Sequence, residues 1–175
     1  MTQLLSHIEE IYKALNNREE VDVIYLDFAK AFDKVDHQLL LQKLHTYGFH
    51  PKVINWIKSF LTNRSQSVVV DGYKSSPSFI ISGVPQGTVL GPILFLIFIN
   101  DIDHCISQSI IRCFADNTRV CKSIESHHDI SALQTDLQSV IEWSERNNMT
   151  LHKDKFEYMP FLQLPKHSLG TTLLV

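Results

Sequence analysis

One short run constrains the fold more than any other part of this sequence. Residues 21–26 read V-D-V-I-Y-L, and Asp27 follows them directly. A run that is almost wholly apolar and rich in β-branched residues is typical of a strand buried on both faces. We therefore expect a central strand at 21–26, covered on both sides and ending in a carboxylate.

The chain has 175 residues, of which 44% are hydrophobic and 20% are charged. These values are typical of one globular domain, or of a piece of a larger protein, and they argue against disorder. The longest apolar run, at 88–100, contains Gly91 and Pro92 and is shorter than the ~18 residues that a membrane span requires. We therefore expect no membrane span.

The net charge of −3 does not suggest a polyanion-binding protein, but the charge is unevenly distributed. Residues 51–74 carry four basic side chains against the single acid Asp71. This segment could face phosphates, although such patterns more often mark a solvated surface. The three cysteines form no C-x-x-C pair and the N-terminus resembles no secretory signal, so we expect an intracellular protein, in cytoplasm or nucleus.

Apolar periodicity and capping residues predict five helices. The expected ranges are 4–15, 37–47 with Asp36 as N-cap, 51–61, 92–105 and 126–147. The helix at 92–105 is apolar almost all round, which is typical of a buried helix.

The remaining patterns predict strands and turns. We expect 67–70 and 78–81 to pair as a hairpin across 71–72, and 110–115 to pair with 118–124 across the two-residue turn 116–117. A last strand at 155–162 contains Pro160, which is tolerated at a sheet edge. From residue 163 onward no pattern persists, so we expect a loose tail.

Most familiar site signatures are absent: there is no H-E-x-x-H, no G-x-S-x-G and no phosphate-binding P-loop. What remains is carboxylates where strands end, with Asp27 after the buried strand and Asp116 at the tip of the expected hairpin. Two such carboxylates could share divalent cations, the arrangement that phosphoryl transfer uses. The alternative is that aspartate is simply a common turn residue.

Three blocks together resemble the reverse transcriptase domain of non-LTR retrotransposons, most closely the jockey-like and chicken-repeat-like elements. Residues 23–37 read V-I-Y-L-D-F-A-K-A-F-D-K-V-D-H, residues 82–92 read S-G-V-P-Q-G-T-V-L-G-P, and residues 114–118 read F-A-D-N-T. The resemblance covers about residues 3–161. It implies an α+β fold with a polymerase palm-type antiparallel sheet backed by helices, and a partial fingers subdomain.

The resemblance also implies roles for individual residues. The expected catalytic residues are Asp27, Asp116 and Lys155, the expected nucleotide-binding residues are Phe28, Phe32, Gln86 and Gly87, and the expected metal ligands are Asp27, Asp116 and Asn117. Phe32 matches the steric gate that excludes a ribose 2′-OH, and Lys155 matches a lysine thought to protonate the leaving pyrophosphate. The implied cofactor is Mg²⁺ or Mn²⁺, and the implied partners are an RNA template, a DNA primer and a deoxynucleoside triphosphate.

Two departures from the family pattern point to an inactive fragment. Asn117 stands where the family has a second aspartate, which lowers the charge facing a metal ion and should weaken its binding. Flanking fingers and thumb elements would also lie outside the chain, so we expect a partial domain at 1–162 and an irregular tail at 163–175. The alternatives are a non-catalytic nucleic-acid-binding remnant and a relic of a retroelement with no function.

Overall fold

The computed structural model describes residues 2–17, 19–114 and 117–161, and the expected tail lies outside them. The chain forms two compact units. The first comprises residues 1–29, 101–146 and 150–175, and the second comprises residues 30–100 and 147–149. The first sequence block, 23–37, is therefore split between the two units, whereas the second block, 82–92, lies wholly in the second unit.

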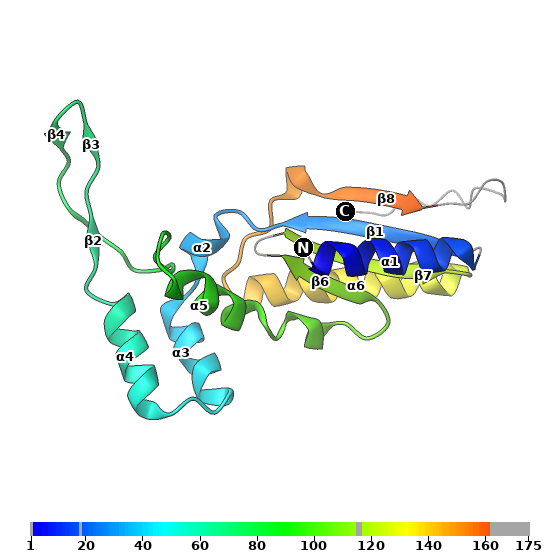
Figure 1. The fold of residues 1–175 in the computed structure, drawn as a ribbon, viewed down its shortest axis with the longest axis horizontal. Helices are drawn as coiled ribbons and strands as arrows, with labels where there is room; N and C mark the ends of the chain where they lie inside the picture. Colours follow the sequence, from blue (N-terminus) through cyan, green and yellow to red (C-terminus); the bar gives the residue numbers. More distant parts are fainter. Residues whose placement is uncertain (1, 18, 115–116, 162–175) are drawn as a thin grey trace. The chain divides into compact units, whose positions relative to one another are not determined.

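The first unit is built on a four-stranded antiparallel sheet (Figure 1). Its strands are β1 (Glu20–Asp27), β6 (Ile110–Phe114), β7 (Asn117–Ile124) and β8 (Glu157–Phe161), in the order β6-β7-β1-β8. The strand expected at 21–26 is therefore central, and all but one of those six residues are fully buried. The strand with Pro160 lies at the edge, as predicted.

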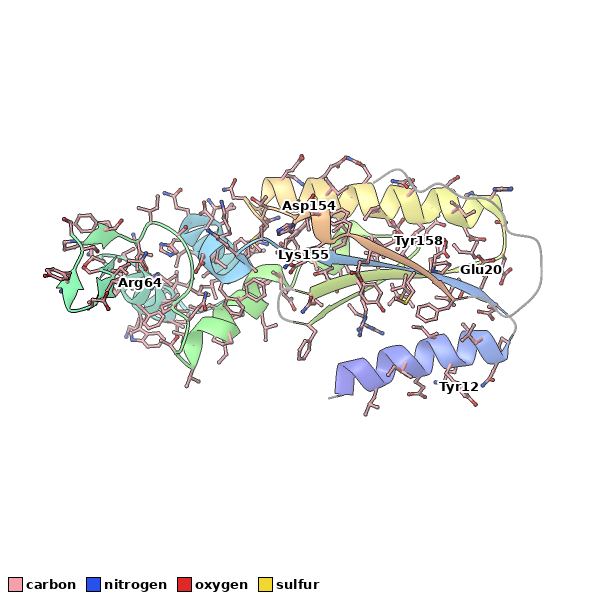
Figure 2. The ribbon with its side chains drawn as sticks, turned by 90° about the horizontal axis from the view of Figure 1, so that it is seen from above. Tyr12, Glu20, Arg64, Asp154, Lys155 and Tyr158 are labelled. Carbon is pink, nitrogen blue, oxygen red and sulfur yellow. The ribbon has the colours of Figure 1, made fainter. Side chains whose placement is uncertain are left out.

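Helices α1 (Thr2–Asn16) and α6 (His127–Arg146) lie on opposite sides of this sheet (Figure 2). Helix α1 places Ala14 and Ile11 against Val21, Val23 and Cys121. Helix α6 buries the apolar stripe that its sequence predicts, Leu133, Leu137 and Val140 among it. The sheet is thus covered on both faces, which is why its central strand is apolar on both sides.

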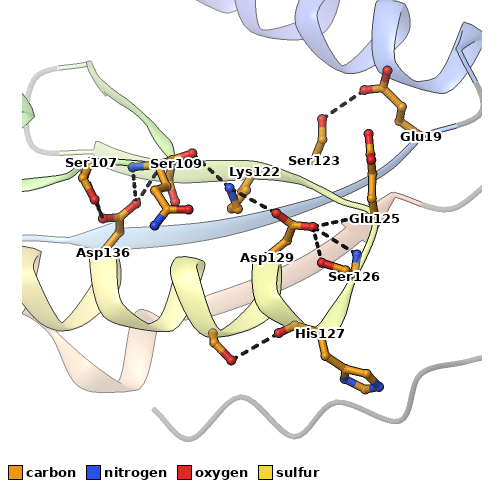
Figure 3. A network of polar contacts seen from close by, with 12 residues as sticks. Glu19, Ser107, Ser109, Lys122, Ser123, Glu125, Ser126, His127, Asp129 and Asp136 are labelled. Atoms are coloured by element: carbon orange, nitrogen blue, oxygen red, sulfur yellow. Dashed lines mark hydrogen bonds and ion pairs between the residues drawn. The ribbon is translucent and has the colours of Figure 1, made fainter.

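Polar contacts hold the connections of this unit in place (Figure 3). The buried carboxylate of Asp136 on α6 accepts hydrogen bonds from the backbone N–H groups of Ser107, Gln108 and Ser109, at 2.7–3.0 Å. Lys122 of β7 contacts Asp129 near the start of α6 at 3.5 Å. These bonds attach α6 to the chain that leads into β6, after the short 3-10 helix η1 (Ile102–Cys105).

The second unit contains four helices and two short ribbons (Figure 1). The helices are α2 (Ala31–Lys34), α3 (His37–Thr46), α4 (Pro51–Leu61) and α5 (Leu90–Ile99). Asp36 caps α3 as predicted, since its Oδ1 accepts from the N–H groups of Gln38 and Leu39. Pro51 occupies the first turn of α4, where its missing N–H costs nothing.

The hairpin expected between 67–70 and 78–81 is wrong in its pairing. Strand β3 (Val69–Val70) pairs instead with β4 (Tyr73–Lys74), and β2 (Ser65–Gln66) pairs with β5 (Ser78–Phe79). The turn at Asp71 and Gly72 has left-handed backbone at both positions, which suits a two-residue hairpin turn. Such a turn brings the residues on either side of it together, so 69–70 cannot reach 78–81.

Two further expectations require correction. The helix expected at 92–105 is α5 followed by η1, and Ile93 and Leu96 of α5 are 47% and 53% exposed. The helix α5 is therefore buried only on part of its apolar surface, which includes contacts with α2 and α3. The tip of the β6–β7 hairpin is also shifted: Phe114 pairs with Asn117, so Asn117 opens β7 rather than lying in the turn.

No helix among residues 2–17, 19–114 and 117–161 is long and apolar enough to cross a membrane.

Candidate functional site

The end of the central strand places Asp27 directly beside Asn117. The two residues are Cα partners in the β1–β7 ladder, each at the terminus of its strand. The side chain of Asp27 is 15% exposed, and its carbonyl oxygen accepts from the N–H of His152 at 2.8 Å. The structure thus brings together the first and third sequence blocks. Asp116 lies outside the described residues.

Lys155, which is labelled in Figure 2, contacts the same carboxylate from another element. It ends the short 3-10 helix η2 (Lys153–Lys155), and its Nζ lies 2.5 Å from Oδ2 of Asp27. The lysine side chain is 60% exposed, so solvent screens much of this ion pair. Three of the sequence-predicted residues, Asp27, Asn117 and Lys155, therefore meet at one end of the sheet.

Phe28 lies in the core of the first unit rather than at a surface. Its side chain is 2% exposed, and its ring centroid is 6.1 Å from that of Trp143 on α6. A ring buried in this way is not available to stack on a nucleotide. The expectation that Phe28 contacts a nucleotide is therefore restricted to its backbone.

In the second unit, Phe32 lies on α2 and stacks on Phe95 of α5. The ring centroids are 4.6 Å apart and the planes are inclined by 25°. Lys30, immediately before α2, has left-handed backbone with φ of 53°, which turns the chain into this helix. Phe32 remains half-buried, so one part of its ring is held by the core while another part stays accessible.

The second sequence block is tied to α2 by several hydrogen bonds. The N–H groups of Gly83 and Val84 donate to the carbonyl oxygens of Val35 and Phe32, both at 2.8 Å. Gly83 has φ of 86°, and a Cβ atom on it would lie 2.8 Å from the Cα of Asp33. Only glycine fits this close backbone approach.

A side chain of the second sequence block, Gln86, is also held by a residue of α2. The exposed Gln86 donates from Nε2 to Oδ1 of Asp33 at 3.2 Å. Gly87 has φ of 77°, and a Cβ there would meet nothing within 4 Å. The loop that carries Gln86 and Gly87 is thus attached to α2, the helix on which Phe32 lies.

Two polar clusters were not predicted from the sequence. The carbonyl oxygen of Gly83 accepts from Nη2 of Arg64 at 2.9 Å and from Nε2 of His37 at 2.8 Å. In the first unit, the buried carboxylate of Asp22 accepts from the Tyr158 hydroxyl at 2.9 Å. Burial raises the pKa of both groups of this pair, and the bond to Asp22 raises that of Tyr158 further. The one available signal was Asp22 itself, an acid inside an apolar strand.

The donor set at the end of the sheet suits a hard cation. Asp27 supplies carboxylate oxygens, and Asn117 can supply a neutral amide oxygen. Among the residues that the structure describes, no group of three acidic, histidine or cysteine side chains could hold a metal ion. A Mg²⁺ ion commonly takes only one or two protein carboxylates, so the described residues fit part of such a site.

Comparison with known proteins shows which family the chain belongs to. The family model described as "Reverse transcriptase (RNA-dependent DNA polymerase)" matches residues 2–173. The chain belongs to the reverse transcriptase family. Among curated relatives, the "RNA-directed DNA polymerase from mobile element jockey" of Drosophila melanogaster is 36% identical over 169 residues. The "Probable RNA-directed DNA polymerase from transposon X-element" of the same fly is 29% identical over 158 residues.

These alignments cover most of this chain but little of the relatives. The jockey alignment includes 92% of this chain and 18% of the relative, and the X-element alignment includes 87% and 17%. This reverse transcriptase domain therefore spans less than a fifth of the length of either retrotransposon protein.

Solved structures support the fold. A structure described as apo telomerase from Candida Tropicalis, truncated from its C-terminal domain, superposes with a TM-score of 0.69 at 13% identity. It covers 99% of this chain and 37% of the telomerase chain. A telomerase structure from Candida albicans gives a TM-score of 0.68 at 13% identity, covering 90% and 31%. The α+β palm-type fold with an antiparallel sheet is thereby confirmed.

Proposed function

We propose that this chain is the palm, with part of the fingers, of an RNA-directed DNA polymerase, and that it lacks polymerase activity by itself. The observation that carries the proposal is the pairing of Asp27 with Asn117 at one end of the sheet. A carboxylate at this place serves two-metal nucleotidyl transfer, whereas a neutral amide beside it weakens cation binding. We assign the partial domain to residues 1–162 and its place of action to the inside of the cell.

In the parent reaction, a primer 3′-oxygen forms a bond to the α-phosphorus of a deoxynucleoside triphosphate, and pyrophosphate leaves. Asp27, Asp116 and Asn117 would hold Mg²⁺ or Mn²⁺, which supplies electrostatic stabilisation of the charge on the phosphoryl oxygens when bound. Lys155 would give a proton to the leaving pyrophosphate from Nζ. Its contact with Asp27 orients that ammonium group toward the same carboxylate.

The residues of the second unit would hold the incoming nucleotide. Phe32 acts as a gate against a ribose 2′-OH, because its stacking on Phe95 resists displacement. Gln86 and Gly87 lie against the nucleotide, and the Gln86 amide is oriented by Asp33. Phe28 contributes only through its backbone. The partners in this proposal are an RNA template, a DNA primer and a deoxynucleoside triphosphate.

A second candidate function is metal-independent binding of nucleic acid. It is favoured by the exposed surface around the ribbons of the second unit, where Tyr73 and Phe79 are 83% and 80% exposed. Lys58 and Lys74 are exposed in the same segment. Exposed aromatic rings beside basic side chains suit single-stranded nucleic acid, on which bases stack while cations contact phosphates. Such binding would fall steeply with salt.

Primer extension on an RNA template tests the first proposal. The unchanged chain, Asn117→Asp and Asp27→Ala would be compared with Mg²⁺ and with Mn²⁺. We expect no extension by the unchanged chain and measurable extension by Asn117→Asp. The double variant Asn117→Asp/Asp27→Ala should lose that extension again. Asp103→Ala, which alters an exposed aspartate of the first unit, is the matched control. Robust extension by the unchanged chain would refute the proposed inactivity.

A further inference from the structure

The second unit carries an open, largely apolar hollow of about 330 Å³ beside α5. Four of the side chains that line it, those of Tyr47, Phe49, Ile93 and Leu96, are 36–53% exposed, and Ile97 and Asn100 complete the lining. Tyr47 and Phe49 follow α3, whereas Ile93 and Leu96 belong to α5. A contiguous exposed apolar surface of this kind is typical of a site that binds another molecule.

The part of the sequence that surrounds this hollow is basic. Residues 37–70, which include α3 and α4, contain no aspartate or glutamate but carry Lys43, Lys52, Lys58 and Arg64. The whole second unit has seven basic and three acidic side chains, a net charge of +4. The first unit has nine basic and sixteen acidic side chains, a net charge of −7. A partner that suits the hollow should therefore be apolar and acidic, as part of the first unit is.

Helix α1 of the first unit has this complementary character. Ile11 packs toward the sheet, whereas Leu5, Ile8 and Tyr12 are 54–64% exposed (Tyr12 is labelled in Figure 2). Because these three positions are three and four residues apart, they form one stripe along the helix. Residues 1–20 carry four acidic side chains against two basic ones. Helix α1 therefore presents an exposed apolar stripe within an acidic segment.

The stripe and the hollow match as a helix and its groove. Amphipathic helices bind apolar grooves through anchors spaced by three, four and seven residues, which is the spacing of Leu5, Ile8 and Tyr12. Binding would remove both apolar surfaces from water, and the opposite charges of the two units would favour the encounter. Both surfaces are exposed in the same chain, so neither covers the other within it. A second copy of the chain supplies the missing partner to each.

We propose that this chain associates with itself head to tail, with α1 of one copy bound in the hollow beside α5 of the next. Because the two surfaces differ, the interface is heterologous, and a further copy can bind at either end of a pair. The association involves none of the residues assigned to the candidate polymerase site. It therefore stands or falls independently of the proposed function.

Sedimentation velocity of the full chain over a concentration series tests the inference. The average mass of the unchanged chain should rise with concentration. Leu96→Asp in the hollow and Ile8→Lys on α1 should each weaken self-association by about tenfold or more, because a charge replaces an apolar anchor. The matched controls are Val68→Asp, at an exposed residue before β3, and Gln138→Lys, on the exposed face of α6. Both should associate as the unchanged chain does.

Mixing the two variants distinguishes a head-to-tail interface from a symmetric one. Leu96→Asp keeps α1 and Ile8→Lys keeps the hollow, so an equimolar mixture should form a complex of two chains and nothing larger. Recovery on mixing also requires that both variants are folded, which thermal unfolding checks independently. A symmetric interface between two hollows would leave Ile8→Lys associating normally and would give no gain on mixing. That result would overturn the inference.

Salt and Lys52→Glu test the contribution of charge. Raising the salt concentration from about 0.1 M to about 1 M shortens the Debye length from about 10 Å to about 3 Å, so association should weaken. Lys52 is exposed in the first turn of α4, and Lys52→Glu should weaken association at the lower salt concentration. Association that neither change affects would contradict the choice of an acidic partner. A chain that stays monomeric at every concentration would also overturn the inference, whether its own α1 or a different partner occupies the hollow.

Discussion

The ammonium group of Lys155 lies 2.5 Å from Oδ2 of Asp27, although the two residues are 128 positions apart in the sequence. Residues 153–155 form a short 3-10 helix just before β8, and β8 pairs with β1. The edge strand therefore delivers a cation to the carboxylate at which the central strand ends. Lysine and a metal ion would compete for the same oxygen atoms.

Removing this lysine should strengthen cation binding. We expect Lys155→Gln to raise the affinity of the chain for Mn²⁺ by up to about fivefold, because exposed ion pairs contribute at most ~1 kcal/mol. Isothermal titration calorimetry would measure it. Lys122→Gln is the matched control, since Lys122 pairs with Asp129 away from the end of the sheet. Unchanged or weaker Mn²⁺ binding in Lys155→Gln would show that the two cations do not compete.

Asn117→Asp should make stability depend on divalent metal. Without metal, the new carboxylate lies directly opposite Asp27, and like charges so paired should lower the free energy of unfolding by about 0.5–1 kcal/mol. Saturating Mn²⁺ should reverse the loss, because a bound cation stabilises the folded state. Thermal unfolding with EDTA and with Mn²⁺ checks this. Asn55→Asp on the exposed surface of α4 reports the effect of a new charge alone, and an equal metal response there would contradict the prediction.

Gly83→Ala should be strongly destabilising. A Cβ at this position would lie 2.8 Å from the Cα of Asp33, and φ is 86°, so the backbone of α2 must move. We expect a loss of about 3 kcal/mol or more in urea unfolding. Gly72→Ala is a sharp control, because Gly72 has nearly the same φ of 84° with nothing within 4 Å. It should lose only the ~1–2 kcal/mol of left-handed strain, and equal losses would mean that the contact with Asp33 is unimportant.

Asp136 should make folding sensitive to acid. Burial alone would raise the pKa of this carboxyl, but hydrogen bonds from Ser107, Ser109 and Gln108 outweigh burial and hold the pKa below its usual value of 3.8. Because the pKa is lowered, the ionised Asp136 carboxylate stabilises the folded state above about pH 4. This contribution to the free energy of unfolding is lost as the pH falls through the folded-state pKa.

Asp136→Asn should therefore lower the free energy of unfolding near neutral pH by about 1–3 kcal/mol and flatten its fall below pH 4. Urea unfolding across pH would measure both effects. Asp103→Asn, at an exposed aspartate of η1, should leave the profile unchanged. A steep acid transition that survives in Asp136→Asn would assign the sensitivity to other carboxylates.

Much of the fold and part of the site could be predicted from local pattern. The apolar run at 21–26 predicted a central strand, and Asp27 then had to lie at a sheet end. Asp36 and Pro51 marked helix starts correctly, because capping and the fixed φ of proline act within a few residues. Pro160 marked an edge strand for the same kind of reason, since its missing N–H matters only to the adjacent strand.

The pairings that carry function depended on tertiary structure. The sequence by itself determined which strands are buried, where helices begin and which motif residues are present, since these follow from side-chain chemistry and short-range backbone preferences. Only the tertiary structure decided that Arg112 faces Arg119, that Lys155 reaches Asp27 and that Arg64 and His37 share the carbonyl of Gly83. The local pattern predicted the β6–β7 hairpin but placed its turn one residue too late, so the register came only from the structure. The other contacts are hydrogen bonds between segments far apart in the sequence, which no local pattern connects.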